Sequence, residues 1–307
     1  MSLAARIATM VAVAVITGCA SGRPIAPPAL VATPVLRSVS RVQLPIAAYE
    51  LTETQMAQVQ YLTQRLRQRC MRNFGFEYLP DLSTVSIAQT VRTAQEFDSR
   101  WYGISDETAA RTYGYQLPTW VNGPAAPQAI ADLSAAERGV LDGSASIYHN
   151  RPVPPGGCVS AAAEQLAQAT ITADVQRSGG ADLSTLVGSI RRNDFNRAQS
   201  DPRVLAEFAA WSTCMDSHGY HYSNPFAALA DPRWGTMGAT PSALEVQTAE
   251  DDIACKLRVN LLGVEYAVVS DYQNADIAKN AQALTAAKTQ VAQETEALPR
   301  LVAQYGT

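Results

Sequence analysis

The side chains in this 307-residue sequence that could carry out chemistry include five cysteines and only three histidines, His149, His218 and His221. A histidine-based hydrolytic site therefore has few candidates. The sequence contains no G-x-S-x-G nucleophile elbow, no H-E-x-x-H zinc motif and no phosphate-binding loop with a G-K-[ST] ending. We therefore predict no catalytic residue and no cofactor.

Two of the cysteines share a motif in which Cys-Met is followed by three residues, a glycine, an aromatic residue, any residue and a second aromatic residue. The first copy lies in residues 67–78 and the second in residues 211–222. Each copy ends an amphipathic helical pattern, and its glycine is suited to stop the helix. A repeated motif that carries a cysteine indicates a duplicated, disulfide-stapled structural unit and not a reaction.

Four cysteines remain when Cys19, at the end of the N-terminal leader, is set aside: Cys70, Cys158, Cys214 and Cys255. An even number of cysteines in an exported protein implies disulfides. Four cysteines allow three pairings, and the repeat favours Cys70–Cys158 with Cys214–Cys255, one in each copy. No two cysteines have C-x-x-C spacing, so we predict structural bridges and not redox catalysis.

His218 and His221 lie three residues apart in the second motif and could reach one metal ion with Asp216 as a third ligand. The alternative is a pair of exposed turn histidines beside a disulfide. The first motif has Phe74 and Glu77 at the matching positions, so the repeat itself does not encode a metal site. We therefore favour the alternative and predict no metal ion.

The acidic residues identify no catalytic pair. Glu250, Asp251 and Asp252 are placed in the first turns of a predicted helix, where a favourable interaction with the helix dipole explains them. Asp271 and Asp276 lie further along the same helical pattern. A carboxylate pair for glycoside cleavage cannot be chosen from the sequence, although a cell-wall hydrolase stays open as the alternative function.

Residues 1–18 have the pattern of an export signal, with one positive charge before an apolar run too short to span a bilayer. The run ends in Ile-Thr-Gly-Cys19, which resembles a bacterial lipobox, so Cys19 is predicted to be the acylated first residue of the mature chain. The alternative is an ordinary secretory signal in which Cys19 is incidental.

The rest of the chain is predicted to have three parts. Residues 19–48 are rich in proline and alanine and indicate a semi-rigid tether. Residues 49–180 form a first helical unit with an insertion, and residues 181–307 form a second unit with a long C-terminal helix. The fold class is mainly α, because apolar residues recur at spacings of three and four and sustained strand alternation is almost absent.

Sequence signals also place several helix boundaries. Capping boxes predict helix starts at Thr52, Ser134 and Ser242. The pattern that begins at Ser242 is the longest, and it continues past a break near Asn274 to Pro299.

The insertion in the first unit is irregular and rich in aromatic residues. Binding residues concentrate in such loops, so we predict a candidate binding surface there. A loop-rich subdomain that packs its own aromatic side chains stays open as the alternative. The candidate residues are Trp101, Tyr102, Tyr113, Tyr115 and Trp120.

Together these motifs resemble a group of uncharacterised extracytoplasmic lipoproteins of actinobacteria, over most of the mature chain. The resemblance implies a membrane-anchored, disulfide-bonded protein, and it supplies no catalytic residue, cofactor or substrate. It depends on W-x-x-C-M-x3-G-Y-x-Y from Trp211, E-D-D-x-x-C-K from Glu250, the two Tyr-Gly pairs at Tyr102 and Tyr113, and Gly156-Gly157-Cys158.

The formal net charge is −4, and it becomes −5 when Arg6 is removed with the leader. No block of lysine and arginine stands out, which argues against nucleic acid as a partner. We expect a non-catalytic binding or interaction module at the cell envelope. Its partners would be the membrane, through the lipid, and an envelope component or protein.

Overall fold

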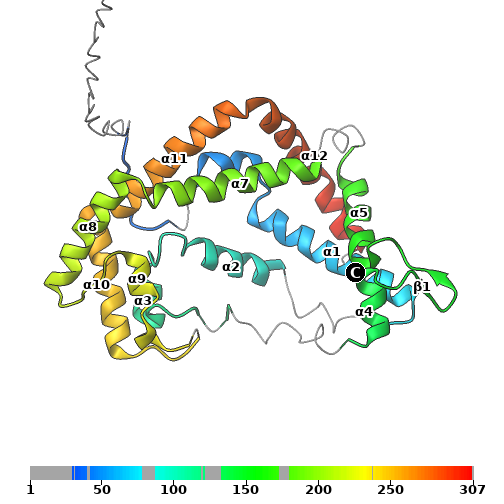
Figure 1. Cartoon of the computed structure of the whole chain (residues 1–307), viewed down its shortest axis with the longest axis horizontal. Coiled ribbons are helices and arrows are strands. Elements are labelled where there is room, and N and C mark those ends of the chain that lie inside the picture. Colours follow the sequence, from blue (N-terminus) through cyan, green and yellow to red (C-terminus); the bar gives the residue numbers. More distant parts are fainter. Residues whose placement is uncertain are drawn as a thin grey trace, which may run out of the picture.

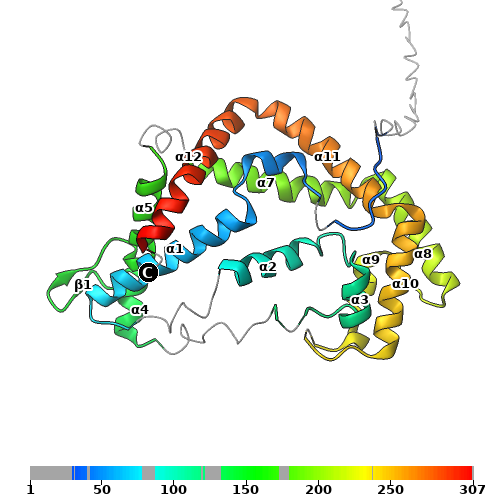
Figure 2. The ribbon, with the colours of Figure 1, turned by 180° about the vertical axis from the view of Figure 1, so that it is seen from behind.

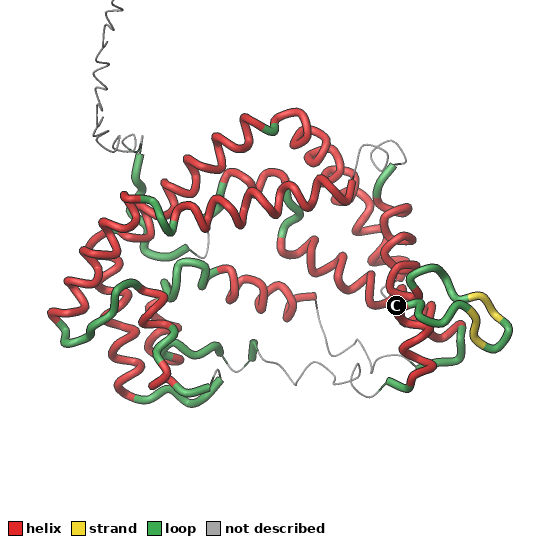
Figure 3. The backbone as a smooth tube through the Cα atoms, in the orientation of Figure 1, coloured by secondary structure: helices red, strands yellow, loops and turns green. Residues whose placement is uncertain are grey.

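The computed structural model describes residues 30, 32–39, 42–77, 87–118, 120–121, 133–172, 180–236 and 238–305. The leader and Cys19 lie outside these residues. The described part is mainly helical, as predicted, with eleven α-helices and one short hairpin (Figure 3). None of the described helices combines the length and the apolar character that a membrane crossing requires.

The helices are α1 (Glu53–Asn73), α2 (Ile87–Asp98), α3 (Glu107–Tyr113), α4 (Ala135–Asp142), α5 (Gly157–Thr170), α7 (Gly180–Ala198), α8 (Pro202–Ser217), α9 (Pro225–Leu229), α10 (Ala243–Val259), α11 (Leu261–Lys279) and α12 (Ala281–Tyr305). The 3-10 helices are η1 (Pro45–Tyr49) and η4 (Pro232–Trp234), and the antiparallel hairpin pairs β1 (Ile147–Tyr148) with β2 (Arg151–Pro152).

The helices gather into two ends that α7, α11 and α12 connect (Figure 1). One end contains α3, α8, α9 and α10, and the other contains α1, α4, α5 and the hairpin, as the view from behind also shows (Figure 2). Elements of both predicted units share each end, because α3 packs against α10 and α12 packs against α1 and α5.

The two predicted disulfides are confirmed. Cys70–Cys158 joins α1 to α5 with a Cα separation of 5.6 Å, and Cys214–Cys255 joins α8 to α10 with a Cα separation of 5.7 Å. Cys158 lies in the first turn of α5, whereas Cys255 lies near the end of α10. The partner cysteines therefore occupy different places in their helices.

The two Cys-Met motifs end their helices in the same local conformation. The glycines Gly75 and Gly219 have φ angles of 85° and 86°. In each copy, the residue after the glycine donates its N–H to the carbonyl of the motif methionine at 3.1 Å, and Met71 and Met215 are fully buried. This 6→1 hydrogen bond is typical of a glycine-terminated helix.

The predicted starts at Thr52 and Ser134 are confirmed as capping boxes of α1 and α4. Ser242 caps α10 by accepting from the Glu245 N–H at 3.1 Å. The Glu245 carboxylate, however, accepts from the backbone N–H of Tyr115 at 3.0 Å. A tertiary contact thus occupies the side chain that the local pattern assigned to the helix end.

The C-terminal helical pattern is divided differently from the prediction. It breaks at Asn260, which has the left-handed φ and ψ angles of 52° and 36°, and again at Asn280. Asparagine adopts the left-handed region more readily than most residues. No break occurs near Asn274, and α12 continues through Pro299.

The described part of the predicted tether is packed against α11. The Pro34 carbonyl accepts from Asn260 Nδ2 at 3.0 Å, and the backbone N–H of Ile46 donates to Gln273 Oε1 at 3.1 Å. Ile46 is fully buried, and Tyr266 donates its hydroxyl to the Gln43 carbonyl at 3.2 Å. From Pro34 onward, the described residues of this segment therefore belong to the folded body.

Gly263 provides the space for this segment on α11. A Cβ atom there would lie 1.9 Å from the Pro34 carbonyl oxygen. We therefore expect Gly263→Ala to release residues 32–39 and to lower the free energy of unfolding, although alanine in a helix is ordinarily about 1 kcal/mol better than glycine. Hydrogen exchange of residues 32–46 and chemical denaturation measure the two effects.

Gly188→Ala in α7 is the matched control. The nearest atom to its added Cβ is the end of the flexible Arg192 side chain, at 3.2 Å. This variant should be as stable as the parent or more stable. If both variants had the same free energy of unfolding and the same hydrogen exchange in residues 32–46, the contact between Pro34 and α11 would not stabilise the fold.

Candidate functional site

The five aromatic residues of the predicted binding surface do not form one exposed patch. Tyr102 and Tyr115 are buried, with 7% and 4% of their surface exposed, while Trp101, Tyr113 and Trp120 are partly exposed. Tyr115 stacks on Trp234 with ring centroids 5.5 Å apart. The buried tyrosines fix the insertion to the rest of the protein, so they are unavailable as a contact surface.

A buried ion pair lies beneath the insertion. Lys256 and Asp252 have side chains 1% and 0% exposed, and Lys256 Nζ lies 3.1 Å from Asp252 Oδ2. The ammonium also donates to the Ile104 carbonyl at 2.8 Å. Asp252 accepts from Trp211 Nε1 at 2.9 Å and from the Tyr115 hydroxyl at 3.3 Å. Burial raises the pKa of Asp252, and these donors oppose that shift.

This arrangement corrects the expectation for the acidic cluster. Asp252 lies well inside α10, not in its first turn, so the helix dipole does not explain it. Because neither Asp252 nor Lys256 reaches solvent, the pair has no access to a substrate. Its role is structural, since it joins the insertion to α8 and α10.

A second buried carboxylate, Glu265 on α11, is only partly satisfied. Its Oε1 accepts from Gln199 Nε2 at 3.3 Å, and its Oε2 has no hydrogen-bond partner among the described residues. Within the same part of the chain, the buried Tyr102 hydroxyl also has no partner. Desolvation raises the pKa of Glu265 to about 8.

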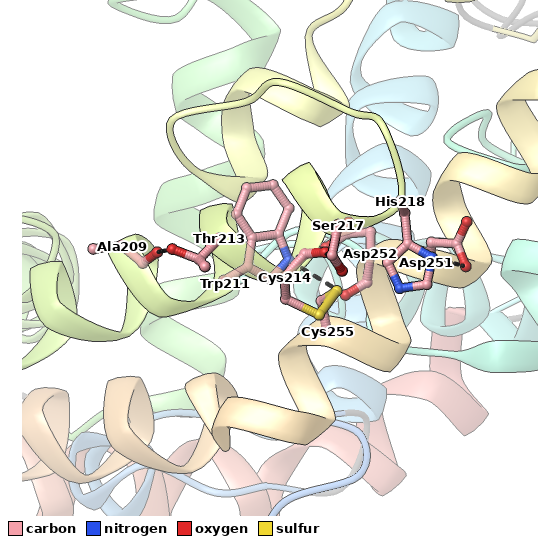
Figure 4. Close-up of a disulfide and its surroundings, with 9 residues drawn as sticks. All are labelled: Ala209, Trp211, Thr213, Cys214, Ser217, His218, Asp251, Asp252 and Cys255. Carbon is pink, nitrogen blue, oxygen red and sulfur yellow. Dashed lines mark hydrogen bonds and ion pairs between the residues drawn. A yellow bond between two sulfur atoms is a disulfide. The ribbon is translucent and has the colours of Figure 1, made fainter.

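Of the three residues that could have shared a metal ion, Asp216 and His221 contact each other, whereas His218 contacts Asp251 instead. His221 Nδ1 lies 2.7 Å from Asp216 Oδ1, whereas His218 Nδ1 lies 3.5 Å from Asp251 Oδ1. Within the described residues, the group that brings three ligand atoms together contains Cys214, His218 and Cys255, whose ligand atoms lie within 4.8 Å of one another (Figure 4). Two of these atoms are joined in the disulfide.

A pocket of about 440 Å³ opens beside the other disulfide, between α1, α5 and the hairpin. Among the residues that the structure describes, Arg69 and Arg151 supply the charge of its lining, and no acidic residue lines it. The remaining lining is polar at Asn73 and Gln165 and otherwise mostly apolar: Leu66, Cys70, Phe74, Pro152, Pro154, Ala161 and Ala162.

The described lining of this pocket offers cationic donors. Arg151 uses one guanidinium N–H to donate to the Asn73 carbonyl, and a guanidinium has further N–H donors. A hydrolase with acidic catalytic residues needs carboxylates at its cleft, and the lining residues that the structure describes include none. The two arginines lie 82 positions apart in the sequence and form no basic block. The sequence pattern therefore did not identify them as candidate binding residues.

Ionisation of Glu265 should make the free energy of unfolding depend on pH. Its pKa is raised from 4.5 to about 8 in the folded state. The folded state therefore holds a proton that the unfolded state loses, so the free energy of unfolding should fall as pH rises through this window. The slope contributed by Glu265 should be about 1 kcal/mol per pH unit.

Chemical denaturation across this pH window should show a shallower slope for Glu265→Gln, which keeps an acceptor for Gln199 and cannot ionise. Asp194, whose pKa burial raises to about 6, contributes a slope of the same sign in both proteins. The difference between the two slopes therefore isolates Glu265. Identical slopes would contradict the assignment.

Comparison of this chain with protein-family models, with curated proteins and with solved structures finds no match.

Proposed function

We propose that this protein is a lipid-anchored, extracytoplasmic binding module without catalytic activity. Its ligand would be a small amphipathic anion, with an apolar body and one carboxylate, phosphate or sulfonate group. The observation that carries the proposal is the pocket beside Cys70–Cys158, where two arginines meet an otherwise largely apolar lining. Its volume lies in the range of about 300–1,000 Å³ that is common for ligand sites.

Two disulfides support an extracytoplasmic location, because such bonds persist in oxidising compartments. The lipobox-like sequence before Cys19 and the resemblance to actinobacterial lipoproteins support attachment to the membrane through a lipid. Leu30, 11 positions after Cys19, already packs against the core. A chain of that length reaches at most about 40 Å, so the body would stay close to the membrane surface.

We also propose that the two Cys-Met motifs are copies of one structural unit. The matching glycine φ angles and the matching hydrogen bond to the motif methionine support this relation. Trp101, Tyr113 and Trp120 keep partial exposure and remain the part of the aromatic insertion that a protein partner would contact.

The anion site predicts a charge-dependent affinity for anilinonaphthalene sulfonate, whose fluorescence rises in apolar surroundings. Arg69→Met and Arg151→Met should each weaken binding about five- to tenfold, because each removes a charge-assisted contact that is partly screened by solvent. A fluorescence titration measures the dissociation constants, and circular dichroism checks that the helices are retained.

Arg72→Met is the matched control, because this exposed α1 arginine does not line the pocket. Phenylnaphthylamine, the same ring system without the sulfonate, should bind the parent and both arginine variants equally. The anion site would be contradicted if Arg72→Met lost as much affinity for anilinonaphthalene sulfonate as the two pocket variants. It would also be contradicted if Arg69→Met and Arg151→Met lost none.

The proposed lipid anchor predicts the mass of the mature N-terminal peptide. After expression in a bacterium that processes lipoproteins, the mature N-terminal peptide should begin at Cys19 and carry diacylglycerol, and the protein should fractionate with membranes. Cys19→Ala should appear in the soluble fraction while retaining both disulfides. An unmodified Cys19 peptide in membrane-extracted protein would contradict the anchor and leave the pocket proposal intact.

A further inference from the structure

The α8–α10 interface brings together four residues whose side chains can bind metal ions. Cys214 and His218 lie four positions apart at the end of α8, and Asp251 and Cys255 lie four positions apart on α10. Residues four apart share a helix face. Each helix therefore directs one pair of potential ligands toward the other helix (Figure 4).

The distances suit a single small ion once the disulfide is opened. The two sulfur atoms and a His218 nitrogen lie within 4.8 Å of one another. Tetrahedral zinc, with Zn–S near 2.3 Å and Zn–N near 2.0 Å, needs ligand atoms about 3.5–3.8 Å apart. The 5.7 Å separation of the cysteine Cα atoms lets side-chain rotation open the sulfur atoms to that spacing.

The surroundings also favour a cation. The site lies at the C-terminal end of α8, where the helix dipole is negative. The Asp251 carboxylate lies 3.5 Å from His218 Nδ1 and can orient the imidazole so that Nε2 is free for a metal. The His218 side chain is 35% exposed and gives an ion a path from solvent to the buried sulfur atoms.

We propose that the reduced Cys214–Cys255 pair, together with His218, binds one Zn²⁺, with water as the fourth ligand and Asp251 positioning the imidazole. A dithiol reductant transfers two electrons and two protons to the disulfide, which gives two thiols, and is itself oxidised to a cyclic disulfide. Zn²⁺ then displaces both thiol protons and binds the thiolates.

The first disulfide is an internal control. Phe74 occupies the place of His218, four residues after the motif cysteine, and Pro154 occupies the place of Asp251, four residues before the partner cysteine. Neither side chain offers a ligand atom. Reduction of Cys70–Cys158 therefore creates a pair of thiols with no imidazole and no carboxylate at these two positions. The proposed zinc site and the proposed anion pocket lie beside different disulfides, so a test of one does not depend on the other.

The test uses the full mature chain, reduced with a dithiol that is then removed without oxygen, and titrated with Co²⁺ and Zn²⁺. The Cys70→Ala/Cys158→Ala variant should bind one Co²⁺, with a thiolate charge-transfer band and the visible absorption of a tetrahedral site, and Zn²⁺ should displace it. His218→Phe should lose at least about a hundredfold in affinity, and Asp251→Asn about tenfold.

The controls separate this site from non-specific thiol binding. Cys214→Ala/Cys255→Ala should show no tetrahedral cobalt spectrum, and His221→Ala, at an exposed neighbouring histidine, should bind as the parent does. Circular dichroism of each reduced variant reports whether the fold persists. Equal metal binding by the parent and His218→Phe, or by the oxidised and reduced parent, would overturn the proposal.

Discussion

The interaction on which one end of the molecule depends is the buried Lys256–Asp252 pair. Its polar atoms connect three segments, because Lys256 also binds the Ile104 carbonyl and Asp252 also binds Trp211 and Tyr115. A buried charge that loses its partner costs about 3–5 kcal/mol. Either charge alone would therefore be strongly unfavourable, and the insertion must stay closed over α10.

The close approach of the insertion to α10 explains why the two Tyr-Gly pairs have glycine at their second position. A Cβ atom on Gly103 would lie 2.9 Å from Lys256 Nζ, and one on Gly114 would lie 2.8 Å from Glu245 Cγ. Both glycines have positive φ angles. The backbone of the insertion can therefore approach the buried charges of α10 only where a side chain is missing. The tyrosines beside these glycines fill the surrounding core, and this use explains why two of them are not exposed.

The features that were predictable from the sequence are those with a local or repeated signal. The capping box at Thr52 and the mainly helical class were predicted correctly from residue spacing, and both disulfide pairings were predicted correctly from the repeated motif. Asp252 and Lys256 also lie four positions apart, but this spacing usually marks a solvated helix face. Their burial depends on the insertion far along the chain, which no local pattern records.

One position in the repeated motif gives the two ends different chemistry. Four residues after the motif cysteine, Phe74 lines the pocket at one end, and His218 lies beside the disulfide at the other. The helix, the methionine and the glycine hold both side chains in the same local frame. The shared residues make the stapled helix end, and the variable residue is free to differ because it lies at the rim and not in the core. This division gives both ends the same local backbone, with an apolar side chain beside the pocket at one end and a group of potential metal ligands at the other.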